Sequence, residues 1–382
     1  MFSRLYIHIP FCLRKCPYCA FVSREGSESE AGDYAELLLE EMLLAGRESA
    51  PRQALDSVYL GGGTPSLLPP RQVSRLLERA ALQFGLAERA EITLEANPGT
   101  VERRRLADFR SAGVNRLSIG FQSFNEHMLA VLGRIHTAQE ALDAFSAARQ
   151  AGFDNIGIDL IHALPGQTLE MWRADLEQAL RLAPEHLSIY GLTVEEDTPF
   201  ADRYDEDSSL LADEDLAADM FECADSMLTD AGYEHYEIAN YARPGCRSRH
   251  NSGYWIRDGY LGLGTGAHSF LKSGDYGLRF GNTSDPEEYA AAINSGHLPR
   301  RDINILLRQD AMAEFMFLGL RLSEGVACSA FEQEFGVAMG QLFGREIDAL
   351  VAQGLLFADS DCIRLTRRGM LLSNRVFARF LP

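Results

Sequence analysis

The sequence predicts an α/β protein built as a partial (β/α)6 TIM-like barrel, followed by a C-terminal helical module with a winged-helix-like hairpin. Three observations lead to this prediction: short apolar runs typical of strands alternate with amphipathic helical stretches, the alternation occurs six times, and the pattern changes after about residue 205. A doubly wound open sheet is the structural alternative. In both arrangements the loops after the strands face one cleft, where a site is expected.

The elements of the barrel follow one another in a regular order. The expected strands are 5–9, 57–60, 91–95, 116–120, 155–161 and 186–190. The expected helices between them are 34–46, 71–84, 102–112, 138–151 and 169–182. Thr137 followed by Glu140 predicts a capping box at the start of one of these helices, and Gly152 is expected to end that helix.

The chain is expected to divide into a barrel over 1–205, a barrel extension over 206–305 and a C-terminal module over 306–382. An acidic segment with Asp202, Asp205, Glu206 and Asp207 marks the first boundary, and a long helix over 210–231 follows it. In the C-terminal module we expect helices over 309–322, 341–353 and 368–380, with a hairpin formed by 355–357 and 362–365.

Composition narrows the classes of function. The chain has 382 residues, of which 46% are hydrophobic and 24% charged, as is ordinary for a globular protein. Its formal charge of -19 disfavours nucleic acid as a partner, because an acidic surface repels phosphates. The sequence has neither an apolar stretch of membrane-spanning length nor a secretory signal, so the expected compartment is the cytoplasm.

Three cysteines lie close together directly after the first expected strand, at Cys12, Cys16 and Cys19. Three thiolates on one tight loop can ligate three irons of a [4Fe-4S] cluster and leave the fourth iron open. A structural zinc site and adventitious cysteines are the alternatives; zinc would need a fourth ligand, and His8 lies on the strand rather than in the loop. The four scattered cysteines are expected to be small buried residues: Cys223, Cys246, Cys328 and Cys362.

Further polar and glycine residues follow the next strands. The run Gly61-Gly62-Gly63-Thr64-Pro65-Ser66 lets the backbone approach a ligand closely, although a tight turn alone would also explain it. Glu95, Gln122 and Asp159 stand at successive strand ends, and Arg134 can pair with a carboxylate. Taken together, these positions favour a ligand pocket at this edge of the sheet.

The Cys-x3-Cys-x2-Cys loop, with Tyr18 before its third cysteine, resembles the signature of the radical S-adenosylmethionine (SAM) superfamily. In that family the open iron chelates SAM, and an electron from the cluster cleaves it to a 5'-deoxyadenosyl radical. The glycine run resembles the family motif that holds the amino group of SAM.

The chain resembles more narrowly the group of the oxygen-independent coproporphyrinogen III oxidases. The likeness covers nearly the whole chain and is carried by the runs 6–12, 61–66, 118–124, 159–168 and 187–190. By this resemblance, the positions that contact SAM are Tyr6, Tyr18, Gly62, Gly63, Thr64, Glu95, Gln122, Arg134 and Asp159.

That group contains true oxidases and haem chaperones of the HemW type. The oxidases carry a fourth cysteine where this sequence has Phe21, and a longer extension than the eleven residues before Cys12. The run His250-Asn251-Ser252-Gly253-Tyr254-Trp255 matches the His-Asn-x-x-Tyr-Trp motif of the chaperones. A neutral imidazole is a good ligand for haem iron, and aromatic rings can cover a porphyrin. By chemistry alone, a loop with only structural contacts is the favoured explanation of the run, and the resemblance to the family reverses this order.

The resemblance therefore implies a haem chaperone that binds a [4Fe-4S] cluster, SAM and haem, with His250 as candidate haem ligand, and that delivers haem to respiratory haem proteins. The alternative is an oxidase that decarboxylates coproporphyrinogen III, so the sequence leaves open whether the chain is an enzyme. It also leaves open a homodimer and a peripheral contact with a membrane. The glycines Gly262, Gly264 and Gly266 lack the spacing of a dinucleotide-binding loop and are expected to form a turn under the cleft.

Overall fold

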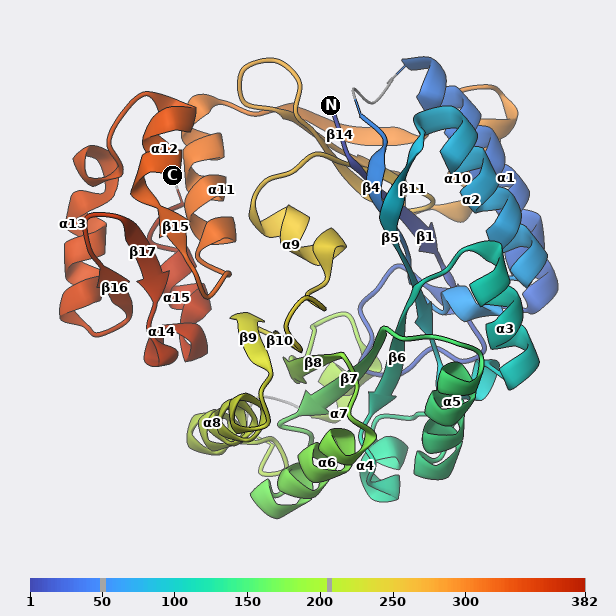
Figure 1. Ribbon diagram of the computed structural model, residues 1–382, viewed down its shortest axis with the longest axis horizontal. Helices are drawn as coiled ribbons and strands as arrows, with labels where there is room; N and C mark the ends of the chain where they lie inside the picture. The colour runs from blue at the N-terminus through green and yellow to red at the C-terminus, as the bar shows by residue number, and fades with distance from the viewer. Residues whose placement is uncertain (49–52, 205–207, 382) are drawn as a thin grey trace.

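A computed structural model of the protein describes residues 1–48, 53–204 and 208–381. Its main feature is a curved 12-stranded sheet in the order β14-β13-β12-β11-β1-β4-β5-β6-β7-β8-β10-β9 (Figure 1). The strands of the parallel centre are β1 (Arg4–Ile9), β4 (Leu55–Gly62), β5 (Leu86–Ala96), β6 (Arg116–Gln122), β7 (Ile156–His162) and β8 (His186–Gly191). All six predicted strands are confirmed, and the partial (β/α)6 barrel with them.

The outer face of the parallel strands is covered by helices (Figure 1). They are α1 (Glu28–Glu48), α2 (Pro70–Phe84), α3 (Arg103–Ala112), α5 (Ala138–Gln150) and α6 (Leu169–Leu182). Their apolar sides join the strands in one hydrophobic core, in which Leu38, Leu76 and Trp172 are fully buried. The capping box of Thr137 and Glu140 is confirmed at the start of α5. The first helix begins at Glu28, six residues earlier than its apolar pattern predicted, because its first turn is polar and exposed.

The segment predicted as a barrel extension supplies strands to both edges of this sheet. After α8 (Glu214–Asp230), β9 (Glu234–Glu237) and β10 (Asn240–Ala242) join the edge next to β8. The chain then crosses to the other edge, where β11 (Tyr260–Leu263) pairs in parallel with β1. β12 (His268–Leu271), β13 (Leu278–Asn282) and β14 (Arg300–Ile305) follow as antiparallel strands. The predicted acidic residues Asp205, Glu206 and Asp207 lie outside the described residues.

Between these two sets of strands lies the short helix α9 (Arg249–Trp255), on the inner side of the curved sheet (Figure 1). It contacts β4 and the C-terminal helix α11 (Arg308–Gly319). The remaining short elements are β2 (Phe11–Cys12), β3 (Arg24–Glu25), the 3-10 helices η1 (Pro65–Leu67) and η2 (Pro98–Thr100), α4 (Glu126–Val131), α7 (Pro199–Arg203) and α10 (Pro286–Asn294).

The C-terminal module has its own hydrophobic core and stands beside the open side of the sheet (Figure 1). It combines α11, α12 (Cys328–Phe335) and α13 (Met339–Ala352) with a three-stranded sheet in the order β15 (Val326–Ala327), β17 (Cys362–Leu365), β16 (Leu356–Ala358). The predicted hairpin is confirmed. The prediction of one final helix is wrong: Leu372 leaves the helical conformation and separates α14 (Arg367–Leu371) from α15 (Ser373–Phe377). No helix in the described part of the chain is long and apolar enough to cross a membrane.

A buried carboxylate ties α1 to the segment between β11 and β12. Glu41, only 1% exposed, accepts hydrogen bonds from the backbone N–H of Gly264 at 2.8 Å, from the Tyr289 hydroxyl at 2.6 Å and from the Asn282 amide at 2.6 Å. Burial raises the pKa of Glu41 to about 7, although these hydrogen bonds oppose the rise. The turn that contains Gly264 is thereby anchored to the outer helix layer.

Replacing Glu41 by glutamine should change how stability depends on pH. The pKa of Glu41 is about 7 in the folded chain and 4.5 in the unfolded chain, so the folded state binds the extra proton between these values and wild-type stability falls as pH rises through them. The amide side chain of the E41Q variant cannot titrate. From pH 5 to pH 8, the free energy of unfolding of E41Q should therefore gain on the order of 2–3 kcal/mol relative to wild type, as measured by urea denaturation. The exposed neighbour variant Glu40→Gln is the control, and a constant difference for E41Q would contradict the assignment.

Candidate functional site

The three clustered cysteines lie on a loop that begins at the end of β1 and is closed by a short parallel pair of strands. β2 pairs with β3, so that Phe11 faces Arg24 and Cys12 faces Glu25. Within the loop, the Cys19 N–H donates to the Cys16 carbonyl at 3.1 Å. The ammonium group of Lys15 donates to the carbonyls of residues 21 and 23 at 3.2 and 3.1 Å. The loop therefore has an internal framework that fixes where the cysteines stand.

The sulfur atoms of this loop are close enough to influence one another. Burial raises the pKa of the Cys12 and Cys19 thiols, and the charges of the neighbouring thiolates add to the rise, while a hydrogen bond with Thr64 opposes it for Cys12. Arg134 contacts the sulfur atom of the remaining cysteine, Cys16: its Nη1 lies 3.4 Å from the Cys16 Sγ, and its Nη2 donates to the Gly120 carbonyl at 3.0 Å. Partly buried thiolates that crowd one another favour a cationic ligand between them.

The arrangement suits an iron-sulfur cluster better than a single metal ion. Among the residues that the structure describes, no three His, Cys, Asp or Glu side chains are gathered as one bound ion requires. In a [4Fe-4S] cluster each cysteine binds a different iron, so its ligands stand farther apart than around one ion. The donor set of three cysteines on one ordered loop fits such a cluster with one iron left for another ligand.

The predicted glycine loop lies directly against the cysteine loop. The N–H of Gly63 donates to the Ile9 carbonyl at 2.8 Å, and the N–H of Thr64 donates to the Phe11 carbonyl at 2.7 Å. A Cβ atom at Gly63 would lie 2.7 Å from the Phe11 carbonyl oxygen, and one at Gly62 would lie 2.5 Å from the His8 ring. At these two positions a side chain would collide with the cysteine loop or with the His8 ring, so the close packing of the two loops requires glycine.

Glu95 connects the glycine loop to the strand ends. Its carboxylate accepts a hydrogen bond from the Gly62 N–H at 3.0 Å and another from the Tyr59 hydroxyl at 2.8 Å. Burial raises its pKa to about 7, and the nearby Asp159 carboxylate adds to the rise. A carboxylate with a raised pKa would be stabilised in its ionised form by a positively charged ligand group.

Two further predicted residues lie on neighbouring strands: Asp159 is in the middle of β7, and Gln122 is the last residue of β6. Asp159 accepts hydrogen bonds from the Ser118 hydroxyl at 3.1 and 3.2 Å, and burial raises the pKa of its carboxyl group. The pairing of β6 with β7 shifts register between Gly120 and Gln122. Gln122 has a φ of 69°, a backbone conformation that is strained for a residue with a side chain. Tyr18 packs edge-on against Phe200, with 6.0 Å between ring centroids.

A cavity of about 520 Å³ joins the cysteine loop, the strand ends and the extension, a volume within the usual range for small-molecule sites. Of the predicted contacts, Tyr6, Gly62 and Glu95 line it, together with residues 20–22 of the cysteine loop. Its other walls come from α9, α11 and β11–β13: Tyr254, Trp255, Tyr260, Gly266, Ala267, His268, Arg279 and Leu318. The prediction that the glycine turn underlies the cleft is confirmed at Gly266.

His250 does not line this cavity, although it belongs to the motif that does. It is fully buried at the start of α9, and its Nδ1 is 2.8 Å from the Ser57 hydroxyl. Its Nε2 is 2.8 Å from the Tyr254 hydroxyl, so both ring nitrogens are engaged. Burial lowers the pKa of His250 to about 3, with the charges of Arg4 and Arg116 contributing, and the imidazole is therefore neutral. In this conformation His250 positions Tyr254.

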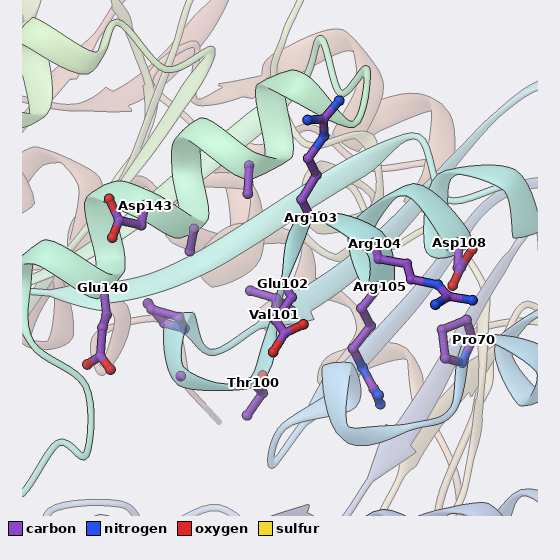
Figure 2. Close-up of a pocket in the computed structure, with 14 residues that line it drawn as sticks. Pro70, Thr100, Val101, Glu102, Arg103, Arg104, Arg105, Asp108, Glu140 and Asp143 are labelled. Atoms are coloured by element: carbon purple, nitrogen blue, oxygen red, sulfur yellow. The ribbon is translucent and has the colours of Figure 1, made fainter.

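A second hollow, of about 700 Å³, lies outside the barrel between α3 and α5 (Figure 2). Its lining mixes Arg103, Arg104 and Arg105 with Glu102, Asp108, Glu140 and Asp143, so it presents no net preference for one charge. Arg105 is occupied by the carbonyls of residues 66–68 at 2.8–3.0 Å. None of the residues predicted for the site lines this hollow.

A partial (β/α)6 barrel with three cysteines after its first strand defines a radical SAM protein. The model of the Radical SAM superfamily matches residues 6–179, and that of the HemN C-terminal domain matches residues 306–372. A solved structure of the coproporphyrinogen III oxidase HemN from Escherichia coli, a radical SAM enzyme, superposes with a TM-score of 0.85 at 26% identity, covering 99% of this chain and 90% of that one.

Relatives that align over nearly the whole chain show which family within the radical SAM superfamily it belongs to. The chain is 38% identical to the heme chaperone HemW of Lactococcus lactis, over 98% of this chain and 96% of the relative. It is 39% identical to HemW of Escherichia coli, over 99% and 97%, and 36% identical to the mouse mitochondrial radical S-adenosyl methionine domain-containing protein 1, over 100% and 87%. The chain belongs to the HemW family of radical SAM proteins.

Several residues in or directly behind the cavity wall were not predicted as part of the site. The Tyr59 hydroxyl donates to Glu95, and the Tyr59 ring centroid lies 5.1 Å from that of His250. The position of Tyr59 on a predicted strand was the only sign in the sequence that it could belong to the site. Tyr260, His268 and Arg279 come from strands that were not predicted. Their proximity to the cysteine loop depends on the pairing of β11 with β1, which a local sequence pattern does not reveal.

Proposed function

We propose that this protein is a haem chaperone. It holds a [4Fe-4S] cluster through Cys12, Cys16 and Cys19, binds SAM at the strand ends, and takes up haem in the adjoining cavity for delivery to respiratory haem proteins. The observation that supports this most directly is the single cavity whose walls include both the cysteine loop and the aromatic pair Tyr254 and Trp255. Full-length similarity to proteins named heme chaperone HemW agrees with it. The proposed compartment is the cytoplasm, where reducing conditions keep the thiols available.

The residues around the proposed cluster and SAM site would have different roles. A bound cluster supplies single electrons at the SAM site. Arg134 donates to the Cys16 sulfur and holds the backbone at Gly120, while Glu95 fixes the glycine loop and presents a carboxylate to the cavity. Tyr6, Tyr18, Gly63, Thr64, Gln122 and Asp159 complete the proposed SAM contacts.

Aromatic side chains would cover the flat faces of haem. Tyr254 packs edge-on against Tyr260 with 4.6 Å between ring centroids, and the guanidinium of Arg321 lies 4.2 Å from the Trp255 ring centroid. These contacts hold the two rings in place at the cavity wall before a ligand arrives, which lowers the entropy lost on binding. Rigid aromatic surfaces of this kind bind large apolar ligands well.

An anaerobic haem titration of the reconstituted protein, followed by Soret absorbance, tests the proposal. We expect saturation at one haem per chain. His250→Ala should weaken binding, because the variant loses the partner of the Tyr254 hydroxyl. If His250 acts only through Tyr254, Tyr254→Phe should weaken binding equally and neither variant should shift the Soret band; a shift in His250→Ala alone would support the prediction that His250 binds the iron.

The second candidate is the coproporphyrinogen III oxidase reaction, favoured by the structural likeness to HemN. Against it stands Phe21, an exposed cavity residue at the position where oxidases of this group carry a fourth cysteine. Conversion of coproporphyrinogen III to protoporphyrinogen by the reconstituted protein with SAM and a reductant, together with no saturable haem binding, would replace the chaperone proposal by this one.

A further inference from the structure

The cavity wall on the side of the extension contains a histidine whose ring is free. Of the two histidines that line the cavity, His8 uses both ring nitrogens: Nδ1 lies 3.0 Å from the Tyr6 hydroxyl and Nε2 lies 2.7 Å from the Val22 carbonyl. His268, in contrast, is exposed, and neither of its ring nitrogens has a hydrogen-bond partner among the described residues. An imidazole can bind a metal ion only through a nitrogen that is not already occupied.

The strand pairing explains why the His268 ring is uncovered. His268 begins β12, and its partner across the ladder on β13 is Gly281. A Cβ atom at Gly281 would lie 3.3 Å from the imidazole ring, so the ring rests over a residue that has no side chain to cover it. Opposite residues on paired strands point to the same face of a sheet, and glycine therefore leaves space on the face that carries the imidazole.

The same hairpin also places a cation at the cavity. Arg279 is paired with Phe270 across β12 and β13, two residues from the His268–Gly281 pair, and its guanidinium lies 4.7 Å from the Phe270 ring centroid. Its Nε donates to Glu314 at 2.5 Å and its Nη1 to the Tyr260 hydroxyl at 3.4 Å. Its Nη2 has no partner among the described residues and is available to a carboxylate, such as a haem propionate.

We propose that His268 is the residue that binds haem iron in the folded protein, with Arg279 paired to a propionate. This inference rests on the proposed haem-chaperone function and deepens it. His268 supplies the free imidazole, Arg279 supplies the charge, and Tyr254 and Trp255 supply aromatic surface, all on the walls of one cavity. His250, enclosed under Tyr254, positions this wall from behind.

The test compares haem complexes of wild type, His268→Ala, His268→Gln and His127→Ala. His127 is exposed on α4 and does not line the cavity, so it is the matched control. Both His268 variants should shift the Soret band and weaken haem affinity at least about tenfold, since even indirect changes at metal sites cost that much. Added free imidazole should restore the wild-type spectrum of His268→Ala, because it can occupy the vacated position on the iron. His127→Ala should behave as wild type.

Two results separate the failures of the two proposals, and a third measurement controls for folding. Saturable binding by wild type with unchanged affinity and spectrum in both His268 variants would overturn the role of His268 and leave the chaperone proposal standing. Failure of wild type to bind haem would overturn both. The position of His268 on an exposed face predicts that its variants fold, and equal melting temperatures of the four proteins would show that a spectral change comes from the ligand rather than from unfolding.

Discussion

Replacing Cys16 by alanine is expected to abolish the brown, air-sensitive chromophore of the reconstituted protein. Each of the three thiolates would bind its own iron, so that loss of one removes a ligand for which the loop offers no substitute. Elsewhere in the described part of the chain, no three His, Cys, Asp or Glu side chains are gathered in a way that could take over the metal. Iron and sulfide content should fall to near zero, and binding of SAM should be lost with the cluster, because in the proposed function the open iron would anchor SAM.

Variants of the other cysteines test whether the loss of the chromophore is specific to the cysteine loop. Cys12→Ala and Cys19→Ala should match Cys16→Ala, since all three sulfur atoms belong to one loop. Cys223→Ala is the control: Cys223 lies on α8, outside the cysteine loop, and its thiol contacts Met227 with 3.7 Å between sulfur atoms. Full iron content in Cys16→Ala, measured by chemical analysis and by electron paramagnetic resonance of the reduced protein, would contradict the assignment of the cluster.

Much of the barrel and its motif residues could be predicted because their signals are local. Each central strand is a short apolar run, and a parallel sheet brings the ends of such runs together irrespective of the details of their side chains. For that reason the sequence alone predicts that Cys12, Gly62 and Glu95 meet at one edge of the sheet, although they lie far apart along the chain. The structure gives the contacts between them, as in the hydrogen bond from the Gly62 N–H to Glu95.

The haem side of the site could be predicted only in part, because its geometry depends on long-range pairing. The sequence motif identified His250, Tyr254 and Trp255, but the motif does not reveal which of them face a cavity. In the folded chain, Ser57 and Tyr254 occupy both nitrogens of His250, and these partners come from a distant strand and from the next helical turn. His268 and Arg279 meet the cysteine loop only because β11 pairs with β1.

The Gly63→Ala substitution should have the second large effect, because it acts on the backbone that carries the cluster. The added methyl group would lie 2.7 Å from the carbonyl oxygen and 2.9 Å from the nitrogen of Phe11, the residue before Cys12. These are backbone atoms of a strand that is held on its other side by β3, so the strand cannot yield without moving Cys12 or breaking the hydrogen bonds that join it to the glycine loop. We expect lower iron content and loss of measurable SAM binding in equilibrium dialysis.

A second glycine provides the control for this experiment. Gly340 lies in α13, and a Cβ atom there would meet nothing within 4 Å. Gly340→Ala should keep the cluster and SAM binding and should leave the fold at least as stable as wild type, because alanine is a better helix former than glycine. If Gly63→Ala retains wild-type iron content and SAM affinity, the close approach of the two loops is not what holds Cys12 in place. If it loses both while its melting temperature stays near that of wild type, the glycine is required by the site itself rather than by the stability of the barrel.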